Sequence, residues 1–168
     1  VIATQQIYQR HYETLADAIS AIGIREIVEV GAPWNGSPTQ VAGAPVTAAG
    51  ILPSEELSAV LADSVIAAFS SNPNYLGKSS LFAAFCAHGV PALCLPTHAV
   101  QLRAWDGIFH GTHFITSVPA NRDEVMPRLT QISEISHKWY LDHQISEHAR
   151  VLAGLIQEGV KAHCAEGS

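Results

Sequence analysis

Residues 64–95 constrain the fold more than any other part of the chain, because two short apolar runs flank a turn and a helix-like segment. The run at 65–69 (VIAAF) is typical of a strand buried on both faces, and the turn formers at 70–74 (SSNPN) end it. The sequence predicts a helix that opens at 77–80 (GKSS) and ends at Gly89, followed by a buried strand at 92–95. Two parallel strands joined by a helix form a βαβ unit.

The start of this helix is the first candidate site. A helix N-terminus offers unpaired N–H groups and a partial positive charge, which together favour an anion. Lys78 adds a full positive charge, and Ser79 and Ser80 add hydroxyl groups. These residues indicate a phosphate or diphosphate site, and the alternative is a serine N-cap beside a solvated lysine. The spacing of a P-loop is absent.

The rest of the chain repeats the alternation of strands and helices. Residues 1–4 are expected to be the last part of a first strand, and further strands are expected at 24–30, 46–49 and 113–118. Helices are expected at 7–22, at 121–135 and at 137–161. A further helix is expected to start at Ser54, which would be its N-cap. The pattern predicts one α/β domain over 1–168, with a parallel sheet covered by helices on both faces. Its ligands would bind at the carboxyl ends of the strands, in the loops at 4–6, 31–37, 50–53, 72–80 and 96–98.

Composition narrows the classes of function. The net charge is −6 without a basic cluster, which argues against nucleic acid or an anionic membrane as partner. No apolar run approaches the roughly 20 residues needed to span a bilayer, and no signal peptide is visible at the start. The three cysteines (Cys86, Cys94 and Cys164) lack metal-type spacing, which favours buried free thiols and a cytoplasmic location. Because the chain begins at Val1, we expect it to be a piece of a longer protein.

The order and spacing of three segments resemble those of a known family. The segments are 50–57 (GILPSEEL), the strand region 65–71, and 85–91 (FCAHGVP). Together the chain resembles the C-terminal, nucleotide-sugar-binding domain of glycosyltransferases with the GT-B fold, of the group-1 or family-4 type. The resemblance implies a Rossmann-like α/β fold that is one half of the GT-B architecture.

The resemblance also implies a donor site. Gly50 and Ile51 would lie near the base, and Asn74 and Tyr75 would contact the base or ribose. The helix start at 78–80 falls where family members hold the diphosphate. Gln5, Gln6 and Arg10 stand where the family carries its other phosphate ligands, although a solvated helix arginine is an alternative for Arg10.

Two departures from the family pattern affect this site. Retaining members carry two glutamates with seven residues between them, which fall here at Leu76 and Ala84. The first of these glutamates is tied to the donor sugar and the second to the ribose, so those two contacts are missing.

The function implied by the resemblance is transfer of a glycosyl group, of the hexosyltransferase type, from a nucleotide-sugar donor to an acceptor that the sequence does not identify. Lys78 and the N–H groups of Ser79 and Ser80 would neutralise the leaving diphosphate. No catalytic residue, cofactor or metal is assigned. A missing N-terminal domain is the expected partner, a homodimer stays open, and the isolated chain is expected to be inactive.

Other interpretations stay open. A non-catalytic, glycosyltransferase-like binding module would explain the loss of both glutamates. Residues 28–32 (VEVGA) are similar to a methyltransferase start, but Pro33 offers no N–H to a cofactor. The histidine pairs 110/113 and 143/148 have no spacing typical of a metal site. His88 is expected to act as a helix-end cation, His98 as a possible ligand contact, and Trp34 and Trp105 as surface-loop anchors or sugar-stacking platforms.

Overall fold

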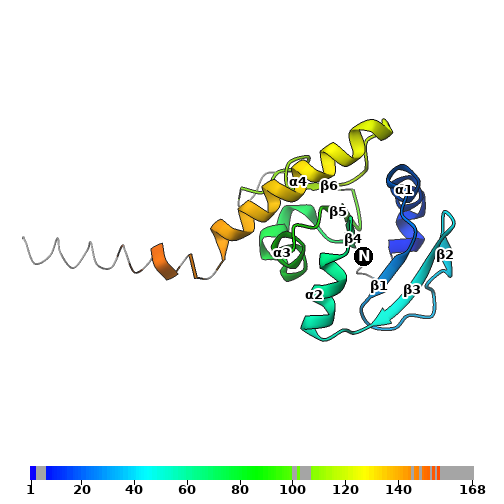
Figure 1. The fold of residues 1–168 in the computed structure, drawn as a ribbon, viewed down its shortest axis with the longest axis horizontal. Helices are drawn as coiled ribbons and strands as arrows, with labels where there is room; N and C mark the ends of the chain where they lie inside the picture. Colours follow the sequence, from blue (N-terminus) through cyan, green and yellow to red (C-terminus); the bar gives the residue numbers. More distant parts are fainter. Residues whose placement is uncertain are drawn as a thin grey trace, which may run out of the picture.

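The computed structural model describes residues 1–2, 7–99, 102 and 107–144, together with 146, 147, 149–151, 153 and 155. These residues form a mixed α/β structure (Figure 1). Its elements in chain order are α1 (Ile7–Ile22), β1 (Ile27–Val30), β2 (Gln40–Val41), β3 (Ala44–Gly50), α2 (Ser54–Ala62), β4 (Ala67–Ser70), the 3₁₀ helix η1 (Pro73–Lys78), α3 (Ser80–Ala87), β5 (Ala92–Leu95), β6 (Phe114–Ile115) and α4 (Arg122–His143).

The strands form two three-stranded groups. In the first, β1 pairs in parallel with β3, and β2 adds an antiparallel hairpin to β3. In the second, β4, β5 and β6 lie side by side in parallel. Ile2 lies between the groups, because it makes parallel bridges to Glu29 of β1 and to Ala68 of β4. The parallel elements therefore follow the order β3-β1-Ile2-β4-β5-β6.

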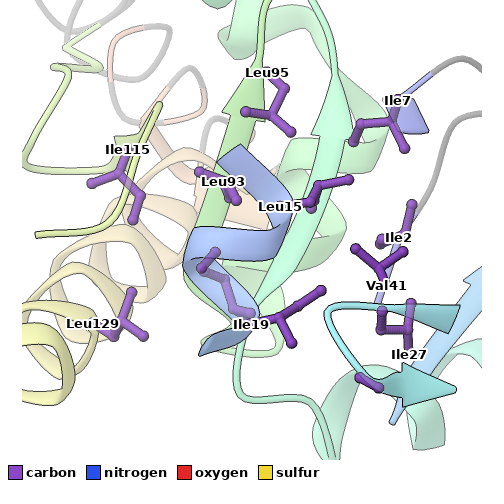
Figure 2. Close-up of a cluster of buried hydrophobic side chains, with 14 of the residues drawn as sticks. Ile2, Ile7, Leu15, Ile19, Ile27, Val41, Leu93, Leu95, Ile115 and Leu129 are labelled. Atoms are coloured by element: carbon purple, nitrogen blue, oxygen red, sulfur yellow. The ribbon is translucent and has the colours of Figure 1, made fainter. Parts of the chain in front are cut away.

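Alternate side chains of β4 and β5 enter two separate hydrophobic clusters, so both faces of these strands are buried. Ala68, Leu93 and Leu95 pack with residues of α1 and α4, and Figure 2 shows side chains from these elements gathered in this cluster. Phe69 and Cys94 point to the other face and pack with residues of α2 and α3. The expectation of helices on both faces of a parallel sheet agrees with this arrangement.

The second cluster is rich in aromatic rings. The rings of Phe69 and Phe85 meet edge to face with centroids 5.3 Å apart. The ring of Phe82 lies against that of Trp139 of α4, with centroids 5.8 Å apart. Helix α3 lies beside α4 along this cluster (Figure 1). The helix ends as predicted at Gly89, whose φ of +63° is the left-handed conformation that glycine adopts most easily.

The first predicted helix has the expected bounds. The helical spacing of its apolar residues predicts one buried face, made of Tyr8, Tyr12, Leu15, Ile19 and Ile22, and this face is only partly as expected. Tyr8, Leu15 and Ile19 are buried, whereas Tyr12 is 48% exposed. The backbone at His11 is not helical (φ −131°, ψ 25°), so the first turn is rotated relative to the rest of α1. This kink breaks the regular spacing that placed Tyr12 on the buried face.

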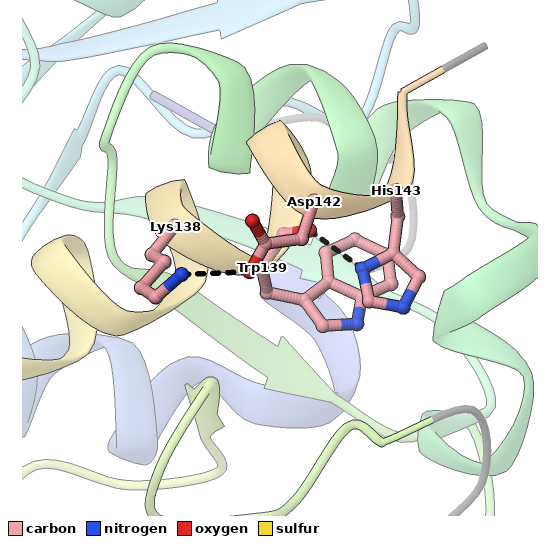
Figure 3. Close-up of polar contacts among 4 residues, drawn as sticks. All are labelled: Lys138, Trp139, Asp142 and His143. Carbon is pink, nitrogen blue, oxygen red and sulfur yellow. Dashed lines mark hydrogen bonds and ion pairs between the residues drawn. The ribbon is translucent and has the colours of Figure 1, made fainter. Parts of the chain in front are cut away.

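The prediction of two helices over 121–135 and 137–161 is wrong, because one helix, α4, runs through the expected break. Ser136 is buried, and its hydroxyl donates to Ile132 O at 2.7 Å. A serine that bonds to the carbonyl four residues earlier stays within a helix rather than starting one. The exposed end of α4 carries an ion pair between Lys138 and Asp142 and a stacked pair of rings, Trp139 and His143 (Figure 3). Residues 156–161 lie outside the described residues.

Several strand and cap boundaries also differ from the predictions. The strand expected from residue 24 begins at Ile27, because Ile24 N–H donates to Ile19 O and completes the end of α1. The expected strand at 46–49 extends over β3, and the hairpin to β2 was not predicted. That hairpin turns through Ala42 and Gly43, which both have positive φ values, as a type I′ turn requires.

Three further boundaries are shorter or shifted. The strand expected at 113–118 is confined to β6. Val65 lies before β4 and is 46% exposed. Pro53, not Ser54, is the N-cap of α2, and Ser54 is its first helical residue. None of the helices in the described part of the chain is long and apolar enough to cross a membrane.

The two-faced core makes a stability prediction. We expect Phe85→Ala to lower the free energy of unfolding by about 3–5 kcal/mol, because Phe85 is fully buried and its ring contacts Phe69. Urea denaturation followed by circular dichroism measures this change. The matched control is Phe109→Ala, which removes a ring that is 49% exposed and should cost less than about 1 kcal/mol. Equal losses in the two variants would contradict the packing described above.

Candidate functional site

The carboxyl ends of β1, β3, β4 and β5 lie at one edge of the structure, because these strands run parallel within their groups and Ile2 pairs in parallel with both groups. The loops that leave this edge are 31–39, 51–53, 71–79 and 96–99. They correspond to the loops that the sequence singles out, apart from residues 4–6. Thr4, Gln5 and Gln6 lie outside the described residues.

The loop after β4 is a compact connection of two caps and a 3₁₀ turn. The Asn72 side chain accepts from the N–H of Asn74 at 3.0 Å, and Pro73 starts η1. The Ser79 hydroxyl accepts from the N–H of Phe82 at 3.2 Å and caps α3. The prediction that Gly77 and Lys78 open the helix is therefore wrong, because they end η1 and α3 begins two residues after Lys78.

The groups available for an anion differ in part from those expected. The Ser79 N–H donates to Leu76 O at 2.9 Å, so it is not a free donor, and its hydroxyl is used as the cap. The N–H groups of Ser80 and Leu81 are the donors at the start of α3 that have no intrahelical acceptor. Lys78 and Ser80 are exposed, and Lys78 makes no ion pair with any residue that the structure describes. The alternative of a serine N-cap is correct for Ser79.

Arg10 is not simply a solvated arginine. Its guanidinium Nη1 donates to Thr97 O at 3.0 Å, so the side chain reaches from α1 to the loop that follows β5. The Thr97 hydroxyl in turn lies 2.9 Å from Nδ1 of the exposed His98. These contacts hold a second positive charge at the carboxyl edge.

The residues expected to meet the base and ribose also lie on this edge. Gly50 ends β3 with a φ of +72°, and its carbonyl accepts from the N–H of Gly31 at 2.9 Å. Ile51 is 78% exposed, Tyr75 is 61% exposed, and Asn74 is half-buried. Two large exposed apolar side chains thus flank the loops in which the sequence places the nucleotide.

The two positions where the resemblance expects glutamates have different surroundings. Leu76 is 2% exposed and belongs to the aromatic cluster, whereas Ala84 is only partly buried against it. A charged side chain at position 76 would face the core. The leucine is therefore part of the packing and not a simple loss of a ligand.

A buried polar group that the sequence analysis missed lies between α1 and β1. Glu29 is only 7% exposed, and one of its oxygens, Oε1, accepts from the Ser37 hydroxyl at 2.8 Å. Tyr8 is 5% exposed, and its hydroxyl lies beside this carboxylate. Burial, and secondly the nearby negative charge of Glu29, raises the pKa of Tyr8. The hydroxyl therefore stays protonated across the physiological range.

A signal for Glu29 was present in the sequence. The charged residues Arg25, Glu26 and Glu29 predict that the strand at 24–30 is less buried than the other strands. Arg25 and Glu26 precede the strand and are exposed, but Glu29 occupies the same face as the buried Ile27. The two-residue period of a strand, applied from Ile27, would have placed Glu29 on the buried face.

The histidines form no metal site within the described residues. Nδ1 of the buried His113 accepts from the N–H of Phe109 at 3.2 Å, so that nitrogen is occupied, and His110 contacts the Thr116 hydroxyl. His88 caps α3, with Nδ1 against Ala84 O and Nε2 2.5 Å from the Ser58 hydroxyl. His148 and Trp105 lie outside the described residues. Trp34 is half-buried and packs against the hydrophobic cluster that contains Leu15 and Leu93, as expected for a loop anchor.

Cys86 and Cys94 are free and buried, and burial raises the pKa of each thiol to about 12. They behave as small apolar side chains and not as reactive thiols. Cys164 lies outside the described residues.

Comparisons with known protein families, with curated proteins and with solved structures found no match.

The cap at Ser79 leads to a prediction about the loop after β4. We expect Ser79→Ala to lower the free energy of unfolding by about 1 kcal/mol, because Phe82 N–H loses its acceptor. The adjacent Ser80→Ala is the control and should change it by less than about 0.5 kcal/mol. Urea titrations of both variants test this difference. A cap role for Ser79 is excluded if the two variants are equally stable.

His113 leads to a prediction about pH. Burial lowers the pKa of His113 below its ordinary value of 6.5, so the unfolded chain takes up this proton at a higher pH than the folded chain. The contribution of neutral His113 to the free energy of unfolding is therefore fully present above about pH 6.5, and it falls as the pH drops below this value. We expect His113→Asn to lose less stability than the original chain between pH 7.5 and 5.5 in urea titrations. Equal losses would show that His113 does not contribute.

Proposed function

We propose that this chain is a nucleotide-sugar-binding domain of a glycosyltransferase, and that it binds the donor diphosphate at the carboxyl edge beside the start of α3. The observation that carries the proposal is the position of Lys78 and Ser80 after β4, where the order of the strands reverses. The proposal includes a Rossmann-like fold as one half of a GT-B enzyme.

The strand order supports this location. The order β3-β1-Ile2-β4-β5-β6 resembles that of a doubly wound sheet, which supports a Rossmann-like fold. Ligands of such sheets bind where the chain reverses direction across the sheet. From Ile2 the chain passes to β1 and β3 on one side and then returns to β4 on the other. The reversal therefore lies above Ile2 and β4, and the loop with Lys78 follows β4 directly.

The charges at this edge fit an anionic ligand. Lys78 is exposed without an ion pair among the described residues, and Arg10 reaches the edge through its bond to Thr97. The donors at the start of α3 add a partial positive charge. During transfer these groups would stabilise the negative charge that develops on the leaving diphosphate, which is often the largest electrostatic contribution to catalysis.

A binding module without transfer activity is the second candidate. One observation favours it, namely that Leu76 is buried in the core where the family pattern has a glutamate for the donor sugar. A domain that holds a nucleotide but lacks this contact would bind without catalysis.

Calorimetric titration tests the proposal. We expect the chain to bind one of UDP, GDP and ADP in preference to S-adenosylmethionine, and Lys78→Ala to weaken this binding about tenfold or more. The physical reason is that a hydrogen bond to a charged group contributes about 1.5–3 kcal/mol, and about 1.4 kcal/mol corresponds to a tenfold change in affinity.

The matched control is Lys138→Ala, which removes an exposed lysine of α4 that pairs with Asp142. It makes the same change in net charge but should leave the affinity unchanged. If Lys78→Ala and Lys138→Ala weaken binding equally, the loss comes from the change in net charge and not from a contact between Lys78 and the diphosphate. Binding of S-adenosylmethionine alone would favour the methyltransferase-like alternative, and the proposal fails if no diphosphate binds.

A further inference from the structure

Two of the unsatisfied buried polar atoms of the structure lie close together. Among the described residues, three buried side-chain atoms have no hydrogen-bond partner: Tyr8 Oη, His11 Nε2 and Glu29 Oε2. Tyr8, in the first turn of α1, lies beside Glu29 of β1. Native proteins contain few such atoms, so the neighbouring pair on Tyr8 and Glu29 requires an explanation.

Burying Glu29 costs more free energy than burying the neutral hydroxyl of Tyr8. A buried carboxylate is stable only where donors or a cation compensate its charge. Oε1 has one donor, the Ser37 hydroxyl, and Glu29 makes no ion pair with a described residue. The Tyr8 hydroxyl interacts with the Glu29 carboxylate, but the contact lacks the geometry of a normal hydrogen bond, and neither Tyr8 Oη nor Glu29 Oε2 has another partner among the described residues. The carboxylate of Glu29 can therefore accept further hydrogen bonds from a ligand that carries donors.

The position of Glu29 indicates which donors these are. Glu29 pairs with Ile2, and Ile2 also pairs with Ala68 of β4, so the carboxylate lies on the strand next to the point of reversal. An acidic residue near the carboxyl end of the second parallel strand is where doubly wound sheets hold ribose hydroxyls. The group contains no set of three metal ligands of the usual types among the described residues.

We propose that Glu29 and Tyr8 form a diol-binding subsite, which takes the ribose hydroxyls of the nucleotide bound at the carboxyl edge. This inference rests on the proposed function. The diol donates to the carboxylate oxygens of Glu29, and the Tyr8 hydroxyl binds one of the same ligand oxygens. Glu29 thereby provides the acidic ribose contact that the sequence lacks at position 84.

The surroundings of Glu29 allow this exchange. The Ser37 hydroxyl has a second acceptor, Trp34 O, at 3.3 Å. When a diol arrives, Ser37 donates to Trp34 O and releases Oε1, so that both carboxylate oxygens face the ligand. No buried hydroxyl is left without a partner by this change.

The experiment compares ribonucleotides with 2′-deoxyribonucleotides by calorimetry on the full chain. The probes are UDP, GDP and ADP, their 2′-deoxy counterparts, and inorganic pyrophosphate. We expect the original chain to bind the preferred ribonucleotide about tenfold more tightly than its 2′-deoxy form. Glu29→Gln should reduce this preference to less than about twofold, because an amide replaces one acceptor oxygen with a donor, while the affinity for pyrophosphate stays unchanged.

Two further variants keep the test decisive. Glu26→Gln is the matched control, since Glu26 is exposed just before β1 and bonds only to Thr47 among the described residues; it should keep the full preference. Tyr8→Phe replaces Glu29→Gln if that variant does not fold, as judged by circular dichroism, and should reduce the preference about threefold.

The outcomes separate this inference from the proposed function. If a ribonucleotide binds and depends on Lys78, but Glu29→Gln and Tyr8→Phe retain the preference for ribose, the subsite is refuted while the proposed function stands. If the original chain binds no diphosphate, the proposed function fails and the subsite falls with it. Loss of the ribose preference in the two variants, with pyrophosphate binding intact, supports the subsite.

Discussion

The pairing of Ile2 on both of its sides is the interaction on which the rest of the structure depends. Its N–H donates to Val28 O, its carbonyl accepts from Val30 N–H, and it also bridges to Ala68. Without this link, β1–β3 and β4–β6 would be two small sheets, each with an exposed edge. With it, the parallel strands share one carboxyl edge, and loops far apart in the sequence become neighbours. The candidate site is thus a consequence of one short segment of backbone pairing.

This pairing also explains why the two hydrophobic clusters differ. Strands β4 and β5 are buried on both faces, so the helices that cover them must each present an apolar surface to one face. The cluster that contains residues of α1 holds mainly aliphatic side chains, and the cluster that contains residues of α3 holds aromatic rings in edge-to-face and tilted contacts. Leu76 belongs to the second cluster because η1 folds the loop after β4 back onto it. The same turn leaves Lys78 and Ser80 exposed at the edge, so the packing of Leu76 positions the residues proposed to bind the diphosphate.

The sequence predicted the elements whose signals are local. The bounds of α1 and β5 follow from helical spacing and from a continuous apolar run, and both agree with the structure. The features that it missed depend on contacts distant in the sequence. A break between two helices was predicted at residue 136, but Ser136 lies inside α4, where its hydroxyl donates to Ile132 O. For the site, exposure of Lys78 was predictable, whereas the bond from Arg10 to Thr97 joins residues 87 positions apart, and no local pattern contains it.

Glu29 illustrates the same limit in energetic terms. In the sequence, a glutamate in a strand indicates a solvated face, since burying a carboxylate is unfavourable unless partners compensate it. Here only two hydroxyl groups compensate the buried carboxylate: that of Ser37, which donates to Oε1, and the neighbouring hydroxyl of Tyr8. An apolar residue at this buried position would avoid that cost. The unsatisfied oxygen lies one strand from the point where the chain reverses, which is where a doubly wound sheet would bind a ligand, and this position is why we propose a ligand contact for Glu29 and not a role in stability.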